Sequence, residues 1–159
     1  MAPPRIDRLV SGGQTGADRA ALDAAIAHGL PYGGWCPAGG WAEDHPAAPG
    51  LLAVYPALTA TGSADPGERT RLNVRESHAT LILRTPGARS PGTDLTRRTA
   101  AALDRPCLES AGDVDEILDW LDGLGPGLTL NVAGPRESEQ PGLYAHSRRV
   151  LGEVLRRSA

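Results

Sequence analysis

Short apolar runs alternate along the chain with segments whose apolar residues recur every three or four positions. Three runs, at 6–10, 79–83 and 128–133, precede glycine-bearing loops and predict buried strands that each lead into a helix. A further short strand is expected at 106–108. Helices are predicted at 18–28, 68–77, from Thr93 or Asp94 to about 103, at 114–121 and at about 141–157.

This order of elements predicts the fold class. Strands that alternate with helices form βαβ units, and successive units build a largely parallel sheet. We therefore expect one α/β domain over residues 1–159, with three layers, about five strands and helices on both faces. The strands at 6–10, 79–83 and 128–132 are expected to be parallel, central and adjacent or nearly so.

Capping residues and one irregular stretch refine this outline. Thr15, with Asp18 three residues later, is expected to cap the first helix, and Asp113 the helix at 114–121. Cys107 begins a short strand and is expected to be buried. The stretch 30–54 is irregular, and a long loop inside a compact domain usually carries function.

Composition narrows the function classes. All 16 basic residues are arginine, so a Walker A phosphate loop and Schiff-base chemistry, which both need a lysine, are excluded. No apolar run approaches the roughly 20 residues that span a membrane. With two cysteines there is no disulfide framework, and we expect a soluble, cytoplasmic protein. A pI near 5.8 argues against nucleic acid as the main partner.

Three loops at the expected carboxyl ends of strands carry glycines and polar residues. In parallel sheets ligands bind at this edge. The loop at 11–18 suits either a phosphate or an ordinary tight turn between strand and helix. Thr93 is either a phosphate ligand or a plain helix cap, and Arg136 either holds a phosphate or carboxylate or pairs with Glu137.

Five blocks of sequence occur in a specific order. They are Ser-Gly-Gly-Gln-Thr-Gly-Ala-Asp-Arg at 11–19, Gly-Gly-Trp-Cys-Pro at 33–37 with Ala-Glu-Asp at 42–44, Arg-Thr-Arg-Leu-Asn-Val at 69–74, Gly-Thr-Asp-Leu-Thr at 92–96, and Leu-Asn-Val-Ala-Gly-Pro-Arg-Glu-Ser at 130–138 with Pro-Gly at 141–142. Together these blocks resemble the putative molybdenum carrier family, the circularly permuted YpsA-like branch of the Rossmann-like superfamily that contains LOG and DprA proteins.

The resemblance implies a Rossmann-like fold, a small phosphate-bearing ligand and a homo-oligomer, either a dimer or a tetramer. The ligand it implies is the molybdenum cofactor or a nucleotide. The loop between Cys36 and Ala42 lacks the basic residues usual in this family, which bears on ligand identity. The expected ligand-binding residues are Ser11, Gly12, Gly13, Gln14, Thr15, Gly16, Asp18, Arg69, Asn73, Gly92, Thr93, Asn131, Gly134, Pro135 and Arg136.

An enzymatic alternative follows from the LOG relatives, which hydrolyse the N-glycosidic bond of nucleoside monophosphates. Their turn motif ends in a glutamate, but Thr96 stands at the matching place here. Glu43, Asp44 and Glu137 are the remaining loop carboxylates and are the candidates for catalysis. Because the turn glutamate is missing, we expect a binding or carrier protein rather than an N-glycosidase.

Other chemistry is weakly indicated. Cys36, Glu43, Asp44 and His45 share one loop, but their spacing matches no zinc pattern, so no metal site is expected. Trp35 and Trp41 flank this loop and are suited either to stacking on a planar base or pterin or to packing in the core.

Overall fold

The sheet has the parallel strands and the strand neighbours that the sequence predicts. The structure, a computed structural model, describes residues 5–87 and 89–158. Five strands pair in the order β2-β1-β7-β5-β6, and all pairs are parallel. The strands are β1 (Ile6–Val10), β2 (Tyr32–Gly33), β5 (Ala79–Leu83), β6 (Cys107–Ser110) and β7 (Leu128–Ala133). The predicted α/β, Rossmann-like class is therefore confirmed, and β1, β7 and β5 are central neighbours.

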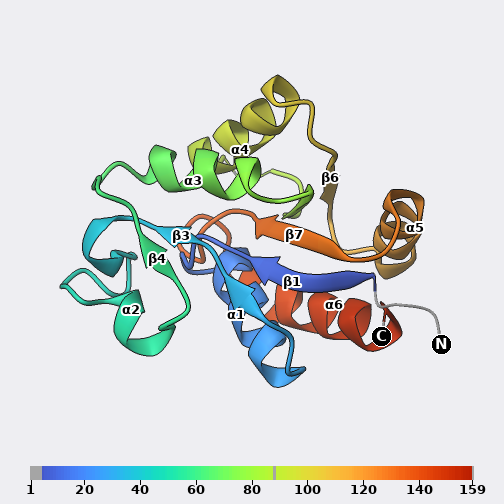
Figure 1. The fold of residues 1–159 in the computed structure, drawn as a ribbon, viewed down its shortest axis with the longest axis horizontal. Coiled ribbons are helices and arrows are strands. Elements are labelled where there is room, and N and C mark those ends of the chain that lie inside the picture. The colour runs from blue at the N-terminus through green and yellow to red at the C-terminus, as the bar shows by residue number, and fades with distance from the viewer. Residues whose placement is uncertain (1–4, 88, 159) are drawn as a thin grey trace.

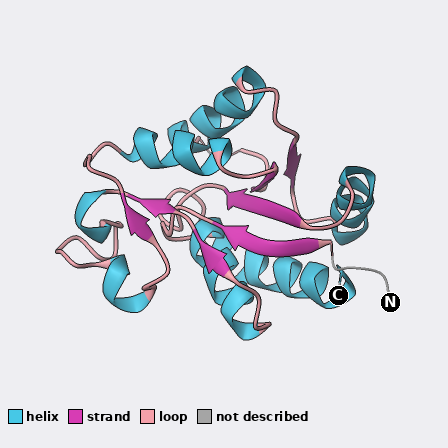
Figure 2. Ribbon diagram, viewed as in Figure 1, coloured by secondary structure: helices cyan, strands magenta, loops and turns pink. Residues whose placement is uncertain are grey.

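Helices cover both faces of this sheet (Figures 1 and 2). On one face α1 and α5 pack against α6, and on the other α3 packs against α4. The helices are α1 (Ala17–Ala27), α2 (Leu51–Val54), α3 (Pro66–Arg75), α4 (Pro91–Ala102), α5 (Val114–Leu124) and α6 (Leu143–Ser158). No helix in the described ranges is long and apolar enough to cross a membrane.

The irregular stretch holds more structure than the sequence predicts. It contains β2, and it contributes β3 (Trp35–Cys36) to a separate two-stranded parallel sheet with β4 (Thr59–Ala60). A short 3₁₀ turn, η1 (Ala38–Gly40), and α2 follow β3 along the chain. Two-residue strands leave no periodic pattern, so only tertiary pairing defines them.

Two predicted helix caps are wrong, and one is confirmed. Thr15 does not cap α1, because its hydroxyl donates to Glu43 instead. Helix α4 begins earlier than predicted: Pro91 fills the first helical position, and Ser90, not Thr93 or Asp94, accepts from the backbone. Asp113 caps α5 as expected, accepting a hydrogen bond from the Glu116 amide.

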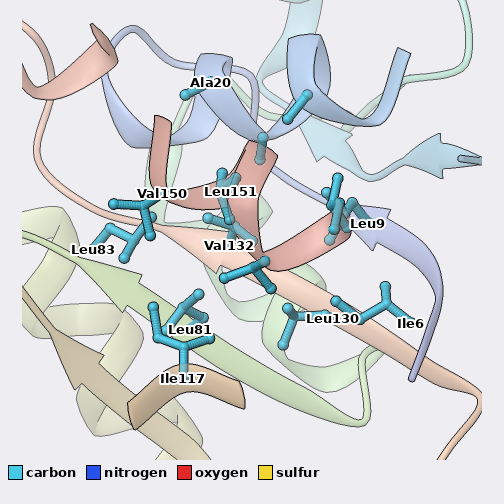
Figure 3. Packing of buried hydrophobic residues seen from close by; sticks show 14 of the residues in the cluster. Ile6, Leu9, Ala20, Leu81, Leu83, Ile117, Leu130, Val132, Val150 and Leu151 are labelled. Atoms are coloured by element: carbon cyan, nitrogen blue, oxygen red, sulfur yellow. The ribbon is translucent and has the colours of Figure 1, made fainter. Parts of the chain in front are cut away.

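The face of the sheet under α1, α5 and α6 is the main apolar core. Alternate residues of β5 and β7, including Leu81, Leu130 and Val132, point into it (Figure 3). Five alanines of α1 are also buried, and their small side chains let this helix lie close to α6 and the sheet. Cys107 is only half-buried, because β6 lies at the edge of the sheet, so the prediction that it is buried is wrong.

The opposite face of the same strands carries polar side chains beside the buried Ile82. Thr80 and Asn131 are paired across β5 and β7, and the Asn131 amide donates to the Thr80 hydroxyl at 3.3 Å. Arg69 and Asn73 from α3 are buried, as are Thr93 and Thr96 from α4. Hydrogen-bonding groups therefore collect between the sheet and the α3–α4 layer, where the candidate site lies.

Candidate functional site

A cavity of about 370 Å³ lies at the carboxyl end of β7, between the sheet and the first turns of α3 and α4. Its volume is at the low end of the roughly 300–1,000 Å³ of small-molecule sites, which suits a ligand the size of a mononucleotide. Of the predicted ligand-binding residues, those that line it are Gly12, Gln14, Asp18, Arg69, Asn73, Gly92, Thr93, Asn131, Gly134 and Arg136.

Arg69 is a buried cation in the cavity wall. The β1–α1 loop fixes it, because its Nη1 donates to the Gly12 carbonyl at 2.9 Å. A Cβ atom on Gly12 would lie only 2.6 Å from that same nitrogen. Gly12 therefore makes room for the Arg69 guanidinium. Burial lowers the pKa of Arg69, and the nearby charge of Arg136 acts in the same direction.

Asp18 is a buried carboxyl in the first turn of α1. It accepts a hydrogen bond from the backbone amide of Gln14 at 3.3 Å. Burial raises the pKa of Asp18 to about 6, although the charges of Arg69, Arg19 and Arg136 and the Gln14 hydrogen bond oppose this shift. The cavity wall therefore contains a carboxyl that titrates close to neutral pH.

Gln14 presents a donor without a partner. Its side chain is 3% exposed, and its Oε1 accepts from the amides of Thr15 at 3.0 Å and Glu43 at 2.9 Å. These two N–H donors identify the oxygen of the side-chain amide. The buried Nε2 has no hydrogen-bond partner among the described residues. An unpaired buried donor is costly, so this group suits a ligand acceptor.

Arg136 lies over an aromatic ring at the edge of the cavity. Its guanidinium carbon is 5.5 Å from the centre of the Trp41 ring, so Trp41 contacts a cation as well as flanking the loop. In the described part of the chain no carboxylate pairs with this guanidinium, and its predicted alternative role, pairing with Glu137, does not occur.

Glu139, which sequence reasoning missed, ties two loops together at the cavity wall. Its Oε1 accepts from the Arg136 amide at 2.9 Å and from the Ser90 hydroxyl at 3.2 Å. Ser90 in turn lies 2.7 Å from the Thr93 hydroxyl. The Glu139 carboxylate thus links the N-terminus of α4 to the backbone of Arg136. No local motif marks Glu139, because its partner Ser90 lies 49 residues away.

The other predicted ligand-binding residues lie outside the cavity wall. Ser11 is internal: its hydroxyl donates to the Asp18 carbonyl and accepts from the Gly13 amide. Gly13 has a φ of +76°, and a Cβ there would meet Leu51 at 2.8 Å, so this glycine faces apolar packing rather than an anion. At Gly16 a Cβ would lie 2.4 Å from the carbonyl of Pro135. Thr15 and Gly16 line a separate surface cavity.

Each of the three catalytic candidates is engaged outside the main cavity. Glu43 accepts from Thr15 and from Ser138, both at 2.9 Å. Asp44 forms a bidentate ion pair with Arg19 at 2.7 and 2.8 Å, and these hydrogen bonds lower its pKa. The Glu137 carboxylate accepts from the amides of Gly142 and Tyr144 at the start of α6.

Asn73 and Cys36 hold the wall in place. The Asn73 side chain accepts from the Trp35 amide at 2.8 Å and donates to the Trp35 carbonyl at 3.0 Å, which anchors β3 to α3. Cys36 is fully buried in the small apolar cluster beside it. Within 5–87 and 89–158, no group of three or more histidine, cysteine, aspartate or glutamate side chains is arranged to hold a metal ion.

Comparisons with known proteins agree with this architecture. Residues 9–155 match the model of the circularly permutated YpsA SLOG family. The structure is similar to the crystal structure of a putative molybdenum carrier protein from Syntrophus aciditrophicus SB, with a TM-score of 0.83, 37% sequence identity and 96% of each chain covered. No match was found among the curated proteins. On these two similarities, the chain belongs to the circularly permutated YpsA SLOG family.

Proposed function

We propose that this protein binds a small phosphate-bearing ligand, a nucleotide or a phosphorylated pterin, in the cavity beside α3 and α4. The observation that carries this proposal is that Arg69 and Arg136 lie in one cavity wall, which Arg71 also lines. Arginine forms strong, charge-assisted hydrogen bonds with phosphate. The N-termini of α3 and α4 meet the same cavity, and their dipoles also favour an anion.

The Syntrophus relative is named as a putative molybdenum carrier protein. We infer from this name and from the family resemblance that the cargo is the molybdenum cofactor, a phosphorylated pterin. The cavity residues fit its phosphate, because two arginines and the unpaired Gln14 amide offer donors to an anion. Leu95 also lines the cavity and would offer an apolar contact to the planar ring. We infer a carrier role from this fit and from the family.

Native mass spectrometry of the protein, purified without refolding, tests the proposal most directly. The mass of a retained ligand would identify it. Calorimetry with AMP, GMP and a pterin phosphate would measure the affinity of the protein for each compound. Arg136→Ala is expected to weaken binding by about 1.5–3 kcal/mol, because it removes a charge-assisted hydrogen bond. The matched control is Arg149→Ala on the exposed surface of α6. If no compound is retained and none binds, the proposal is wrong.

An N-glycosidase is the second candidate, and one observation favours it. The acidic residues that line the cavity are Asp18, Asp65 and Glu139, whereas Glu43, Asp44 and Glu137 do not line it. A chromatographic assay of base release from nucleoside monophosphates decides between the candidates. Turnover that is lost in Glu139→Gln but kept in Glu137→Gln would establish the enzyme. We expect binding without appreciable base release.

We further infer from the family resemblance that the protein is a homo-oligomer, a dimer or a tetramer, and that it acts in the cytoplasm. Light scattering coupled to size-exclusion chromatography measures the assembly. A monomer at all concentrations tested would contradict this inference.

A further inference from the structure

One corner of the cavity combines four groups, and the proposed function explains all of them except a buried carboxyl. They are the unpaired Gln14 amide, the Arg69 and Arg136 guanidinium groups and the buried Asp18 carboxyl. Resting on the proposed function, we propose that Gln14, Arg69 and Arg136 form a subsite for the dianionic phosphate of a phosphate monoester, and that Asp18 takes up a proton from solvent when the anion binds.

The Gln14 side chain is fixed as a donor toward this subsite. Both hydrogen bonds to its Oε1 come from backbone amides, of Thr15 and Glu43, so rotating the amide group by 180° would set N–H against N–H. The nitrogen keeps both hydrogens without a protein acceptor in the described ranges. A phosphate oxygen supplies the missing acceptor.

The two arginines differ in how they are held. Arg69 is 7% exposed and is fixed by the Gly12 carbonyl at 2.9 Å, so it is a permanent charge of the wall. The Arg136 backbone amide donates to Glu139, and the Arg136 guanidinium lies over the Trp41 ring. Among residues 5–87 and 89–158, no carboxylate forms an ion pair with this guanidinium. Two cations beside one amide donor match a terminal, doubly charged phosphate better than a singly charged diester.

Asp18 couples anion binding to the uptake of a proton. The charged groups whose fields reach it are Arg69 from α3, Arg19 from α1 and Arg136 from the β7–α6 loop, all cations. They oppose the burial that raises the pKa of Asp18 to about 6, so this carboxyl is mostly ionised at pH 7. An arriving dianion repels the carboxylate and raises its pKa further. Binding at pH 7 therefore consumes protons, and affinity falls as pH rises through and above 6.

The subsite is tested with inorganic sulfate, whose charge is constant between pH 6 and 8, and with AMP against its methyl phosphodiester. Calorimetry in buffers of different ionisation enthalpy counts the protons taken up. We expect net proton uptake on sulfate binding at pH 7, none in Asp18→Asn, and at least tenfold tighter binding of AMP than of the diester.

Gln14→Glu is the sharpest variant, because it keeps the acceptor for Thr15 and Glu43 and replaces the donor with a negative oxygen. We expect at least a tenfold loss of sulfate and AMP affinity. Gln140→Glu, a residue outside the cavity lining, is its matched control. Should Gln14→Glu fail to fold, Arg136→Met keeps the apolar contact with Trp41 and is expected to lose at least tenfold, with Arg149→Met as control.

The outcomes separate the subsite from the proposed function. If AMP binds but Gln14→Glu and Arg136→Met bind it as well as the wild type, the subsite is wrong and the proposed function stands. Equal affinity for AMP and its diester, or proton uptake that persists in Asp18→Asn, also overturns the subsite. If neither sulfate, AMP nor a pterin phosphate binds the wild type, both proposals fail.

Discussion

The two faces of the sheet are built from neighbouring residues of the same strands, yet they differ in chemistry. Leu81, Leu130 and Val132 face α1, α5 and α6 and form a continuous apolar core. Thr80 and Asn131 face α3 and α4 and are joined by a hydrogen bond. One layer supplies the free energy of folding through apolar burial. The other gives up apolar contact for donors and acceptors around a cavity, which is what a binding site requires.

Leu130→Ala tests the apolar side and has the largest expected effect. The side chain is fully buried in the main core, so its truncation should lower the free energy of unfolding by about 2–5 kcal/mol. Urea unfolding monitored by circular dichroism measures this. Thr129→Ala, on the adjacent residue of β7, is the matched control and should stay within about 0.5 kcal/mol. An equal loss of unfolding free energy in both variants would contradict the conclusion that the two faces of the sheet differ.

Asp18→Asn tests the cost of burying charge on the polar side. The folded pKa of Asp18, about 6, exceeds the unfolded value, so acidification from 6 toward 4 stabilises the wild type through this group. Above pH 6 the carboxylate destabilises the fold by about 3 kcal/mol, from roughly two pKa units at about 1.4 kcal/mol each. The variant should gain up to this amount at pH 7.5 and nothing near pH 4, measured by urea unfolding. A gain independent of pH would contradict the assignment.

Asp44→Asn should change the stability with the opposite pH dependence and by a smaller amount. The hydrogen bonds from Arg19 lower the pKa of Asp44, so this pair stabilises the fold at neutral pH and loses that contribution as pH falls through the folded pKa. Because the Asp44 side chain is 44% exposed, the loss at pH 7 should be under about 1 kcal/mol. Thermal melting at pH 7 and pH 3 would reveal it. A variant less stable by the same amount at both values would argue against the ion pair.

Gly92→Phe should change stability least and binding most. Gly92 lines the cavity in the first turn of α4, and a Cβ there meets no atom within 4 Å. The ring should fill the cavity, abolish AMP binding and leave the free energy of unfolding within about 0.5 kcal/mol. Gly123→Phe in α5, which has equally open space, is the control and should bind normally. Calorimetry and urea unfolding together provide both readouts.

The sequence predicts the sheet and the position of the site better than the role of each site residue. Short segments rich in leucine, isoleucine and valine identify β1, β5 and β7, because the buried positions of the sheet demand apolar side chains. The glycines at 12, 13 and 16 look like groups that let an anion approach. Instead they make room for Arg69, Leu51 and Pro135, which only the tertiary fold brings there. The same limit hides Glu139, whose partner Ser90 is distant in sequence.

The Arg69 guanidinium occupies the space that a side chain at position 12 would fill, although the two residues lie 57 positions apart in the chain. A methyl group at position 12 would displace the guanidinium that binds its carbonyl, so a larger residue at position 12 requires a shorter one at position 69. Homologues should therefore exchange the two positions together, with a larger residue at 12 accompanied by a shorter one at 69. In the laboratory, the damage from Gly12→Ala should be relieved by Arg69→Ser, and this covariation offers a way to recognise family members that have given up the buried cation.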